Sequence, residues 1–484
     1  MPAIAVALVA AALAVRLVDL QSQPGGLYPD EGAEALDAYR LLHVPGFHPV
    51  FFHDDGGREA LYAYVVAVAF RIAGASVLVL RSVSVAIGVL AVAALYPALR
   101  RFGPAVTLAG MAWAAGALWL ICISRDGMRN VLVPLFGALL LWALVRWADR
   151  PARGAALLAG AIAGAGLWTY QPLKLAPILV VLWLLWLRHA NHERYLRMRS
   201  GLGWFALAYA IAGAPMLLTA VMDPVNYFGR AAGVSPLNPA NSGIGFVDHT
   251  LRTLGMFVFA GDPNPRHDVG SLPLLGWPLF GLACLGAWSA WTRRHDPGYA
   301  LVLLGVPVFL LPPLLGIDGG VPHFLRSLGL APFLAALVGM GAALLIDLSR
   351  RRPGPWPRVL AVASLAVLLA VVGAGSWIAY FSRPQSARYQ AFAYDVVALA
   401  NAAGPRDAVV VDDYNRIDVE FLDAGRPTRI FQHGVPLTDP GRYAQVLALS
   451  RQDLEVALGP AVAARARVVS TTPAGRPAVW SVAP

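Results

Sequence analysis

The chain has 484 residues, of which 58% are hydrophobic and only 14% are charged. Soluble domains carry about 25% charged residues, so this composition excludes a water-soluble globular protein. Apolar stretches of roughly 17 to 22 residues recur, which indicates membrane-spanning helices and excludes the alternating segments of about ten residues found in a β-barrel. A net charge of +10 would suit nucleic acid, but the placement of the charges indicates membrane topology instead.

We predict about eleven transmembrane helices from these apolar stretches. They cover residues 3–20, 82–99, 105–123, 131–148, 155–170, 173–187, 203–222, 273–291, 299–316, 328–347 and 359–380. The stretch 60–79 is also apolar, but Arg71 interrupts it. Its uninterrupted part is too short to cross a hydrocarbon core of about 30 Å, so we expect an interfacial or re-entrant helix. The spans themselves are predicted to be almost free of charge.

With this arrangement every arginine cluster of the loops falls on one side of the membrane. The clusters lie at residues 100–101, 146–153, 188–199, 293–294 and 350–358. The positive-inside rule makes that side cytoplasmic, together with the N-terminus. We therefore expect a multi-pass protein of the plasma membrane whose loops 21–81 and 223–272 are extracytoplasmic.

Beyond residue 380 the sequence changes character. Short β-like runs occur at residues 408–411, 428–432, 467–470 and 478–482, between helical or turn segments at 388–402 and 439–458. This alternation is typical of a small α/β domain. We divide the chain into a transmembrane domain, residues 1–380, and a soluble extracytoplasmic domain, residues 381–484. At the first run, Asp412 and Asp413 indicate a solvated strand end, with a ligand-binding edge as the alternative.

The first long loop is rich in carboxylates. Its acidic residues up to position 60 are Asp30, Glu31, Glu34, Asp37, Asp54, Asp55 and Glu59. Asp30 and Glu31 precede a predicted short helix over 32–42, where the helix dipole favours carboxylates; an ordinary helix cap is the alternative reading. Carboxylates in a partly desolvated site at a membrane surface suit general-base catalysis on a hydroxyl, or binding of a divalent cation. No HExxH spacing occurs, so metal use stays open.

Basic residues on the same face lie in short loops between spans. They are Arg125 and Arg129, Lys174 beside Tyr170, and Arg326 beside His323. Lys174 is the only lysine of the chain. Charged residues at span ends often only reach toward the interface, but several beside an acidic loop favour a phosphate-bearing ligand. The polar string Gly-Asp-Pro-Asn-Pro-Arg-His-Asp at 261–268 predicts a structured surface turn, with a wall of this site as the alternative.

In this order along the chain, these segments resemble the GT-C membrane glycosyltransferases, in the branch of protein O-mannosyltransferases and the lipid A aminoarabinose transferase (glycosyltransferase families 39 and 83). The resemblance rests on Asp30-Glu31, residues 58–62, residues 124–129, Tyr170 with Lys174, and residues 322–326. It implies transfer of a sugar from a polyprenyl-phosphate carrier to an acceptor hydroxyl or phosphate on the extracytoplasmic side.

The resemblance also implies roles for individual residues. Asp30 would deprotonate the acceptor with support from Glu31, and Glu59 would orient the acceptor or a metal. The donor phosphate would be bound by Arg58, Arg125, Arg129, Tyr170, Lys174, His323 and Arg326. Asp126 is the nearest match to an acidic residue that the family carries after its third span. No cofactor is certain, and a divalent metal is left open.

The expected partners are a polyprenyl-phosphate-sugar donor, a lipid, glycan or protein acceptor, and membrane lipids, with no nucleic acid. The sequence leaves the sugar and the acceptor open. Two other classes remain as alternatives. A polyprenyl-lipid transporter or flippase would need intramembrane charges or helices broken at the midplane. A non-catalytic membrane sensor would have no use for the acidic first loop.

Overall fold

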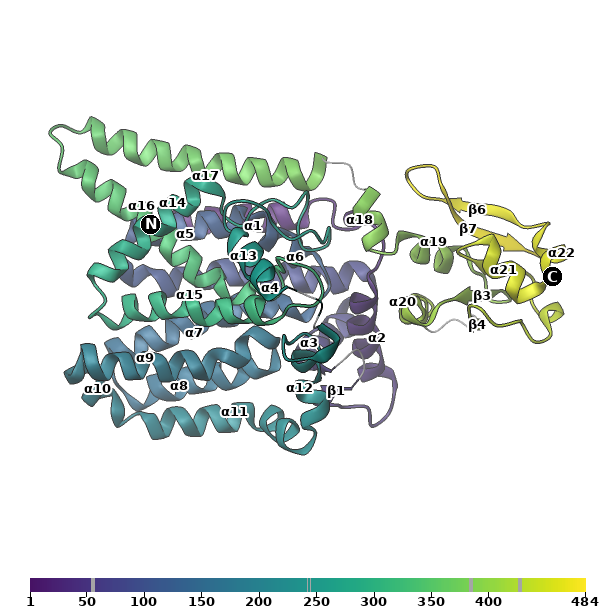
Figure 1. Ribbon diagram of the computed structural model, residues 1–484, viewed down its shortest axis with the longest axis horizontal. Coiled ribbons are helices and arrows are strands. Elements are labelled where there is room, and N and C mark those ends of the chain that lie inside the picture. The colour runs from purple at the N-terminus through teal and green to yellow at the C-terminus, as the bar shows by residue number, and fades with distance from the viewer. Residues whose placement is uncertain (54–56, 242, 244, 383–385, 425–428) are drawn as a thin grey trace.

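The computed structural model describes the chain except for residues 54–56, 242, 244, 383–385 and 425–428, so Asp54 and Asp55 lie outside the described residues. Long helices form a bundle, and a small sheet domain lies beyond one end of it (Figure 1). The N-terminus lies at the opposite end of the bundle from that domain. The two parts correspond to the helical and α/β segments expected from the sequence.

Each predicted span coincides with a helix of the bundle. These helices are α1 (Pro2–Leu17), α4 (Val77–Leu99), α5 (Pro104–Gly116), α6 (Leu118–Arg125), α7 (Leu132–Asp149), α8 (Arg153–Ala165), α9 (Ala176–Ala190), α11 (Leu202–Met222), α14 (Gly276–Thr292), α15 (Pro297–Leu315), α16 (Ala331–Arg350) and α17 (Trp356–Ser382). Among the described residues, seven helical stretches are long and apolar enough to cross a membrane, or eight if the bent pair α5 and α6 counts as one. The spans predicted at α1, α8 and α14 form helices of only 16, 13 and 17 residues.

The predicted span 105–123 is not one straight helix. It breaks between Gly116 and Leu118, where α5 and α6 meet at an angle of 57°. The break deprives carbonyl groups of α5 of their helical partners, and the guanidinium of Arg16 replaces them. Arg16 donates to the carbonyls of Ala115 at 3.0 Å and Ala114 at 3.3 Å.

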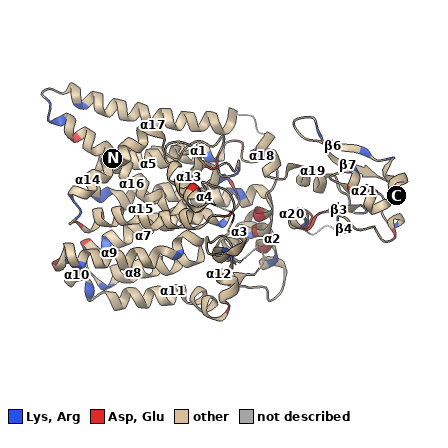
Figure 2. Ribbon diagram, in the orientation of Figure 1, with Lys and Arg blue, Asp and Glu red and all other residues tan. Residues whose placement is uncertain are grey.

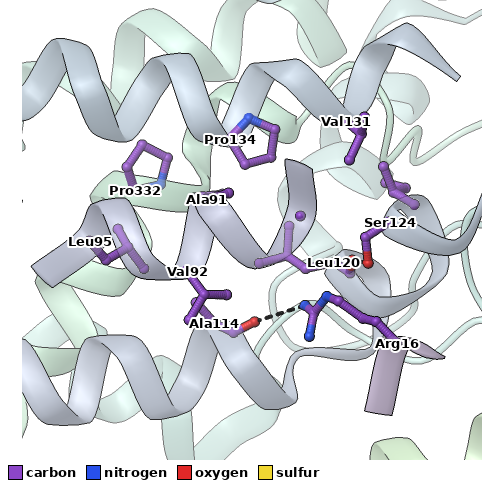
Figure 3. A pocket seen from close by; sticks show the side chains of 13 residues that line it. Arg16, Ala91, Val92, Leu95, Ala114, Leu120, Ser124, Val131, Pro134 and Pro332 are labelled. Carbon is purple, nitrogen blue, oxygen red and sulfur yellow. Dashed lines mark hydrogen bonds between the residues drawn. The ribbon is translucent and has the colours of Figure 1, made fainter. Parts of the chain in front are cut away.

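Arg16 reaches this break from the last turn of α1 and is almost fully buried. Its guanidinium lies in a small, mostly apolar cavity of about 30 Å³ among α4, α5, α6 and α7 (Figure 3). An unsatisfied backbone group costs several kcal/mol in an apolar interior, so these hydrogen bonds stabilise the bend. The prediction that the spans are nearly free of charge is therefore wrong at Arg16, because a break in a neighbouring helix supplies its partners.

At the end of the bundle that faces the sheet domain, the first long loop forms α2 (Pro29–His43), the paired strands β1 (Phe51–Phe52) and β2 (Arg58–Glu59), and α3 (Leu61–Ala73). The α3 helix has only 13 residues and ends at Gly74, whose φ of +84° suits glycine. It is too short to span, as predicted for residues 60–79. The second long loop adds α12 (Pro224–Gly233) and α13 (Phe246–Gly255), while α10 (His192–Arg199) lies at the other end.

The C-terminal domain has one five-stranded sheet with strand order β4-β3-β5-β7-β6. The strands are β3 (Ala408–Val411), β4 (Arg429–Gln432), β5 (Val446–Ala448), β6 (Arg467–Thr471) and β7 (Pro477–Val482). β3 pairs in parallel with β4 and β5, whereas β7 runs antiparallel to β5 and β6. Its helices are α18 (Ser386–Ala391), α19 (Tyr394–Ala402), α20 (Asp413–Leu422), α21 (Arg451–Leu458) and α22 (Pro460–Ala463). The sequence did not predict β5 or α20.

The α20 helix joins the domain to α2. Asp412 caps α20 by accepting a hydrogen bond from the backbone of Asn415 at 2.9 Å, so the end of β3 is a helix cap in the structure. Gly32 of α2 allows the close approach, because a Cβ there would lie 1.9 Å from a carboxyl oxygen of Asp418. Nearby, the rings of Phe70 and Phe421 stack at 5.8 Å. The domain therefore packs on the helix that carries Asp30.

We expect Arg16→Met to destabilise the protein, because it leaves the two carbonyls at the α5–α6 break without donors at about 1–3 kcal/mol each. Thermal unfolding of the purified protein in detergent measures this as a lower midpoint. The matched control is Arg71→Met, at an exposed position near the end of α3, where a change within about 0.5 kcal/mol is expected. Equal midpoints for the two variants would show that Arg16 does not stabilise the bend.

Candidate active site

A cavity of about 680 Å³ opens at the end of the bundle beside α2. Its lining combines apolar residues of α9, α12 and α15 with polar and charged residues. The polar lining comprises Tyr28, Asp30, Tyr170, Gln171, Lys174, Arg230, Asn264, Arg266, His267, Asp318, His323 and Arg326. Five residues selected from the sequence therefore line one cavity: Asp30, Tyr170, Lys174, His323 and Arg326.

Asp30 is half-buried in the first turn of α2. That turn begins with Pro29, whose fixed φ suits the first helical position, and with Tyr28 as the N-cap. The ring of Tyr28 is covered by the guanidinium of Arg266, 3.4 Å from the ring centroid, and its hydroxyl accepts a hydrogen bond from Tyr414 at 2.6 Å. Burial and the nearby Asp30 raise the pKa of Tyr28, so the phenol stays protonated.

Glu31 does not line the cavity. Its carboxylate is fully buried and accepts two hydrogen bonds from Arg81, both at 2.9 Å, and one from the backbone of Gly127 at 2.6 Å. It also accepts a hydrogen bond from the backbone of Tyr28 at 3.1 Å, which closes the N-terminal cap of α2. Glu31 therefore supports Asp30 by fixing the start of the helix, without facing the cavity itself.

Glu59 and two of the predicted phosphate ligands, Arg58 and Arg129, also lie away from the cavity lining. They belong to a buried ion chain, defined here as Asp37, Arg58, Glu34, Arg129, Glu59 and Lys174. The contacts run from Asp37 to Arg58 at 2.6 Å, on to Glu34 at 4.0 Å, to Arg129 at 2.8 Å, to Glu59 at 3.1 Å and to Lys174 at 2.9 Å. Of its members, Lys174 lines the cavity.

The chain alternates in sign and contains equal numbers of cations and anions. Burial alone would raise the pKa of Glu59, but Lys174 and Arg129 outweigh it and hold that pKa below its usual range. At the far end, burial raises the pKa of Asp37 to about 6, although Arg58 opposes the rise. The carboxylate of Glu59 is therefore committed to its two cations rather than available as a base.

Arg125, another predicted phosphate ligand, also lies outside the cavity lining. Its guanidinium donates to the carbonyls of Arg16 at 2.8 Å and Gln23 at 2.9 Å, and lies over the ring of Tyr380 at 4.7 Å. It thus ties α1, the following loop and α17 to the end of α6. The adjacent Asp126 is buried as well, and burial together with Glu31 raises its pKa to about 8.

The sequence did not single out Arg230 of α12 as a candidate ligand, although the structure places it in the cavity lining. For residues 261–268 it offered a wall of the site as an alternative reading, and Asn264, Arg266 and His267 line the cavity. The sequence signal for these three lining residues was the polar string itself, in which an arginine and a histidine follow a turn. Arg230 had no such signal, because it is one arginine in an ordinary amphipathic helix.

Three residues could hold a metal ion, and two of them, His267 and His323, line the cavity. One ligand atom each from Asp262, His267 and His323 lies within 4.8 Å of the others. The pKa of His323 is lowered well below its usual range by burial, by Arg326 and by His267, so the ring is neutral at pH 7. Neutral imidazole is the form that binds transition metals.

Comparison with known proteins supports the fold. Residues 59–218, about a third of the chain, match a family model described as dolichyl-phosphate-mannose-protein mannosyltransferase. A search of curated proteins finds no match.

Several solved structures superpose over almost the whole chain. ArnT from Cupriavidus metallidurans in the apo state matches with a TM-score of 0.62 and 14% identity, over 99% of this chain and 97% of that one. The structure of the same protein bound to undecaprenyl phosphate matches with a TM-score of 0.58 and 15% identity, with the same coverage of both chains. A third match is the archaeal oligosaccharyltransferase AglB from Archaeoglobus fulgidus, in complex with an inhibitory peptide and a dolichol-phosphate. Its TM-score is 0.53 and its identity is 13%, over 99% of this chain and 74% of that one. The chain therefore has the GT-C fold of multi-pass membrane glycosyltransferases, as the resemblance in its sequence implied.

Proposed function

We propose that the protein is a glycosyltransferase that moves a sugar from a polyprenyl-phosphate carrier to an acceptor hydroxyl or phosphate. The observation that carries the proposal is the lining of one cavity. It combines the carboxylate of Asp30, four cationic side chains and an apolar wall. The similar structures of ArnT with undecaprenyl phosphate and AglB with dolichol-phosphate support the same ligand class.

The cationic side chains suit the phosphate of such a donor. Lys174, Arg230, Arg266 and Arg326 reach the cavity from four different parts of the chain. Guanidinium and ammonium groups bind phosphate oxygens through charge-assisted hydrogen bonds, which strengthen as charge builds on the leaving phosphate. These four groups, with Tyr170 and His323 beside them, form the donor-phosphate site in this proposal.

The apolar wall suits the polyprenyl tail. Ile178 of α9, Phe228 of α12 and Leu315 of α15 line the cavity, and between 44% and 50% of each side chain is exposed. Helices α9 and α15 belong to the bundle, so an apolar chain leaving the cavity here would enter the lipid phase directly. The donor would then keep its tail in the bilayer and its phosphosugar in the polar part.

Asp30 is the candidate general base. The acceptor O–H would give its proton to the carboxylate while its oxygen bonds to the anomeric carbon, and the bond from that carbon to the phosphate oxygen would break. The leaving phosphate would be held by the cationic side chains on the opposite side of the reacting carbon. This arrangement fits an inverting displacement.

The site faces the extracytoplasmic side in this proposal. The arginine clusters gather near α10 and the loop between α16 and α17, whereas acidic residues gather at α2 (Figure 2). At the arginine-rich end, Arg101 pairs with Asp149 and Asp296, and these ion pairs join three loops that are cytoplasmic in this proposal. Residues 381–484 would form a separate extracytoplasmic domain beside the transmembrane domain 1–380. The acceptor class stays open among lipid, glycan and protein.

We expect Asp30→Asn to lower turnover by about 10²–10⁴-fold, because the amide cannot accept the acceptor proton. The measurement is release of labelled sugar from a panel of polyprenyl-phosphate sugars by the purified protein in lipid. Asp318→Asn, which removes another carboxylate of the same cavity, is the control and should stay close to wild type. A transporter or sensor would keep its activity in both variants, so unchanged turnover in Asp30→Asn would reject the general base.

Arg266→Gln should weaken binding of undecaprenyl phosphate by roughly tenfold or more, since one charge-assisted hydrogen bond is lost. Binding is measured by calorimetry in detergent, with Arg252→Gln as the control. Arg252 is exposed on α13 of the same loop and pairs with Asp248 at 2.8 Å. Equal affinities in the two variants would place the phosphate elsewhere.

The proposed orientation is tested by labelling intact cells with a membrane-impermeant maleimide, in a background carrying Cys284→Ser. His48→Cys, in the exposed first long loop, should be labelled, whereas Arg351→Cys, in the loop between α16 and α17, should react only after the cells are lysed. The reverse pattern would place the cavity on the cytoplasmic side.

A further inference from the structure

Another cavity lies at the end of the bundle opposite the sheet domain, close to the N-terminus (Figure 1). It has a volume of about 470 Å³ and lies where the ends of α1, α4 and α7 meet. No described residue lines both this cavity and the one that contains Asp30. The residues that line it are Met1, Pro97, Arg100, Arg101, Trp142, Val145, Arg146, Asp149 and Arg150. The transfer step proposed above gives this cavity no role.

The charged part of the lining is mostly cationic. It holds four arginines and one aspartate. Arg101 is paired, since it binds Asp149 and Asp296, both at 2.7 Å. The other three arginines form no ion pair with any residue that the structure describes, and all three are exposed. They are Arg100, Arg146 and Arg150. Three guanidinium groups are therefore free to bind an anion that enters the cavity.

Two helices bring these three arginines together. Arg146 lies in the last turn of α7, and Arg150 is the C-cap of that helix. The backbone of Arg150 donates to the carbonyl of Arg146 at 2.9 Å, so the helical spacing continues to it and both side chains start from one face. Arg100 is the C-cap of α4, which packs along α7. The same cavity is thus lined by arginines from the ends of two neighbouring helices.

The rest of the lining is apolar and marks the depth of the cavity in the membrane. Trp142 is half-buried and Val145 is buried, and both lie in the last turns of α7. Pro97 lies near the end of α4. Both helices belong to stretches long and apolar enough to cross a membrane, so their ends lie where the hydrocarbon core meets the lipid headgroups. Tryptophan is enriched at that level.

We propose that this cavity binds the headgroup of an anionic phospholipid. Guanidinium groups bind phosphate oxygens through charge-assisted hydrogen bonds, often in pairs. Basic pockets between membrane helices bind anionic headgroups in this way. The phosphate lies among Arg100, Arg146 and Arg150, and the first carbons of the acyl chains lie against Trp142 and Val145. These apolar side chains favour a lipid over free phosphate.

The site holds a lipid that is not a substrate, because it lies at the other end of the bundle from Asp30. The bound lipid joins α4 to α7 where their arginines would otherwise repel one another. It should therefore stabilise the protein. This inference does not rest on the proposed function, and its test needs no glycosyl donor.

The first test is native mass spectrometry of the full-length protein in detergent, titrated with cardiolipin, which carries two phosphates. Wild type should bind one cardiolipin more tightly than any further one. Changing Arg146→Gln and Arg150→Gln together should weaken this first binding by roughly tenfold or more, because charge-assisted hydrogen bonds are lost. Arg100→Gln, on the other helix, should weaken it as well. Size-exclusion profiles should not change, since all three arginines are exposed.

The matched control is the double variant Arg351→Gln and Arg352→Gln. It removes the same charge from two exposed arginines between α16 and α17 that do not line the cavity. Its first cardiolipin should bind as in wild type. Equal weakening in both double variants would show attraction to net charge alone and would overturn the site. Wild type that binds its first cardiolipin no more tightly than later ones would also overturn it.

Thermal unfolding in detergent distinguishes the lipid from other sources of phosphate. Cardiolipin should raise the midpoint of wild type and of the control, but not that of the variant changed at Arg146 and Arg150. Phosphatidylcholine, whose phosphate is balanced by choline, and inorganic phosphate should raise the midpoint of none of them. A rise with inorganic phosphate as large as that with cardiolipin would assign the cavity to a free anion and overturn the lipid site.

Discussion

The geometry of the bundle end that holds the cavity depends on the buried ion chain from Asp37 to Lys174. Its six charges come from α2, β2, the turn before α7 and the turn before α9, so the chain joins the first long loop to the membrane-spanning helices. Removing one member of a buried ion pair leaves an uncompensated charge, which is far more costly than the pair is stabilising. The elements that it joins are therefore held in one arrangement, and that arrangement delivers the ammonium of Lys174 to the cavity.

The structure separates two groups of arginines that look alike in the sequence. Arg58, Arg81, Arg125 and Arg129 are buried and pair with carboxylates or backbone carbonyls. Arg230, Arg266 and Arg326 line the cavity. Short motifs such as Arg-Asp-Gly-Met-Arg identify the loop but not the direction of each side chain, because that direction is set by partners far away in the chain. This is why three of the predicted phosphate ligands, Arg58, Arg125 and Arg129, lie in buried contacts rather than in the cavity lining.

The parts of the fold that depend on local composition could be predicted, and those that depend on distant partners could not. Every predicted span coincides with a helix, because length and apolarity define a span locally. The break between α5 and α6 was missed, since it is stabilised by Arg16 about a hundred residues earlier in the chain. Strand β5 has only three residues and is ordered by its neighbours β3 and β7. Among the residues that line the cavity, Asp30 and Lys174 were selected from the sequence, whereas Arg230 required the tertiary structure.

The helix that carries Asp30 is held from both sides. On the bundle side, Arg81 binds Glu31; on the other side, α20 of the C-terminal domain packs against Gly32, and Tyr414 binds Tyr28. The carboxyl of Asp418 lies in this contact, where burial and the nearby Glu31 and Asp30 raise its pKa well above the usual range. A charged group there would repel the carboxylates of α2. The C-terminal domain therefore helps to position the candidate base.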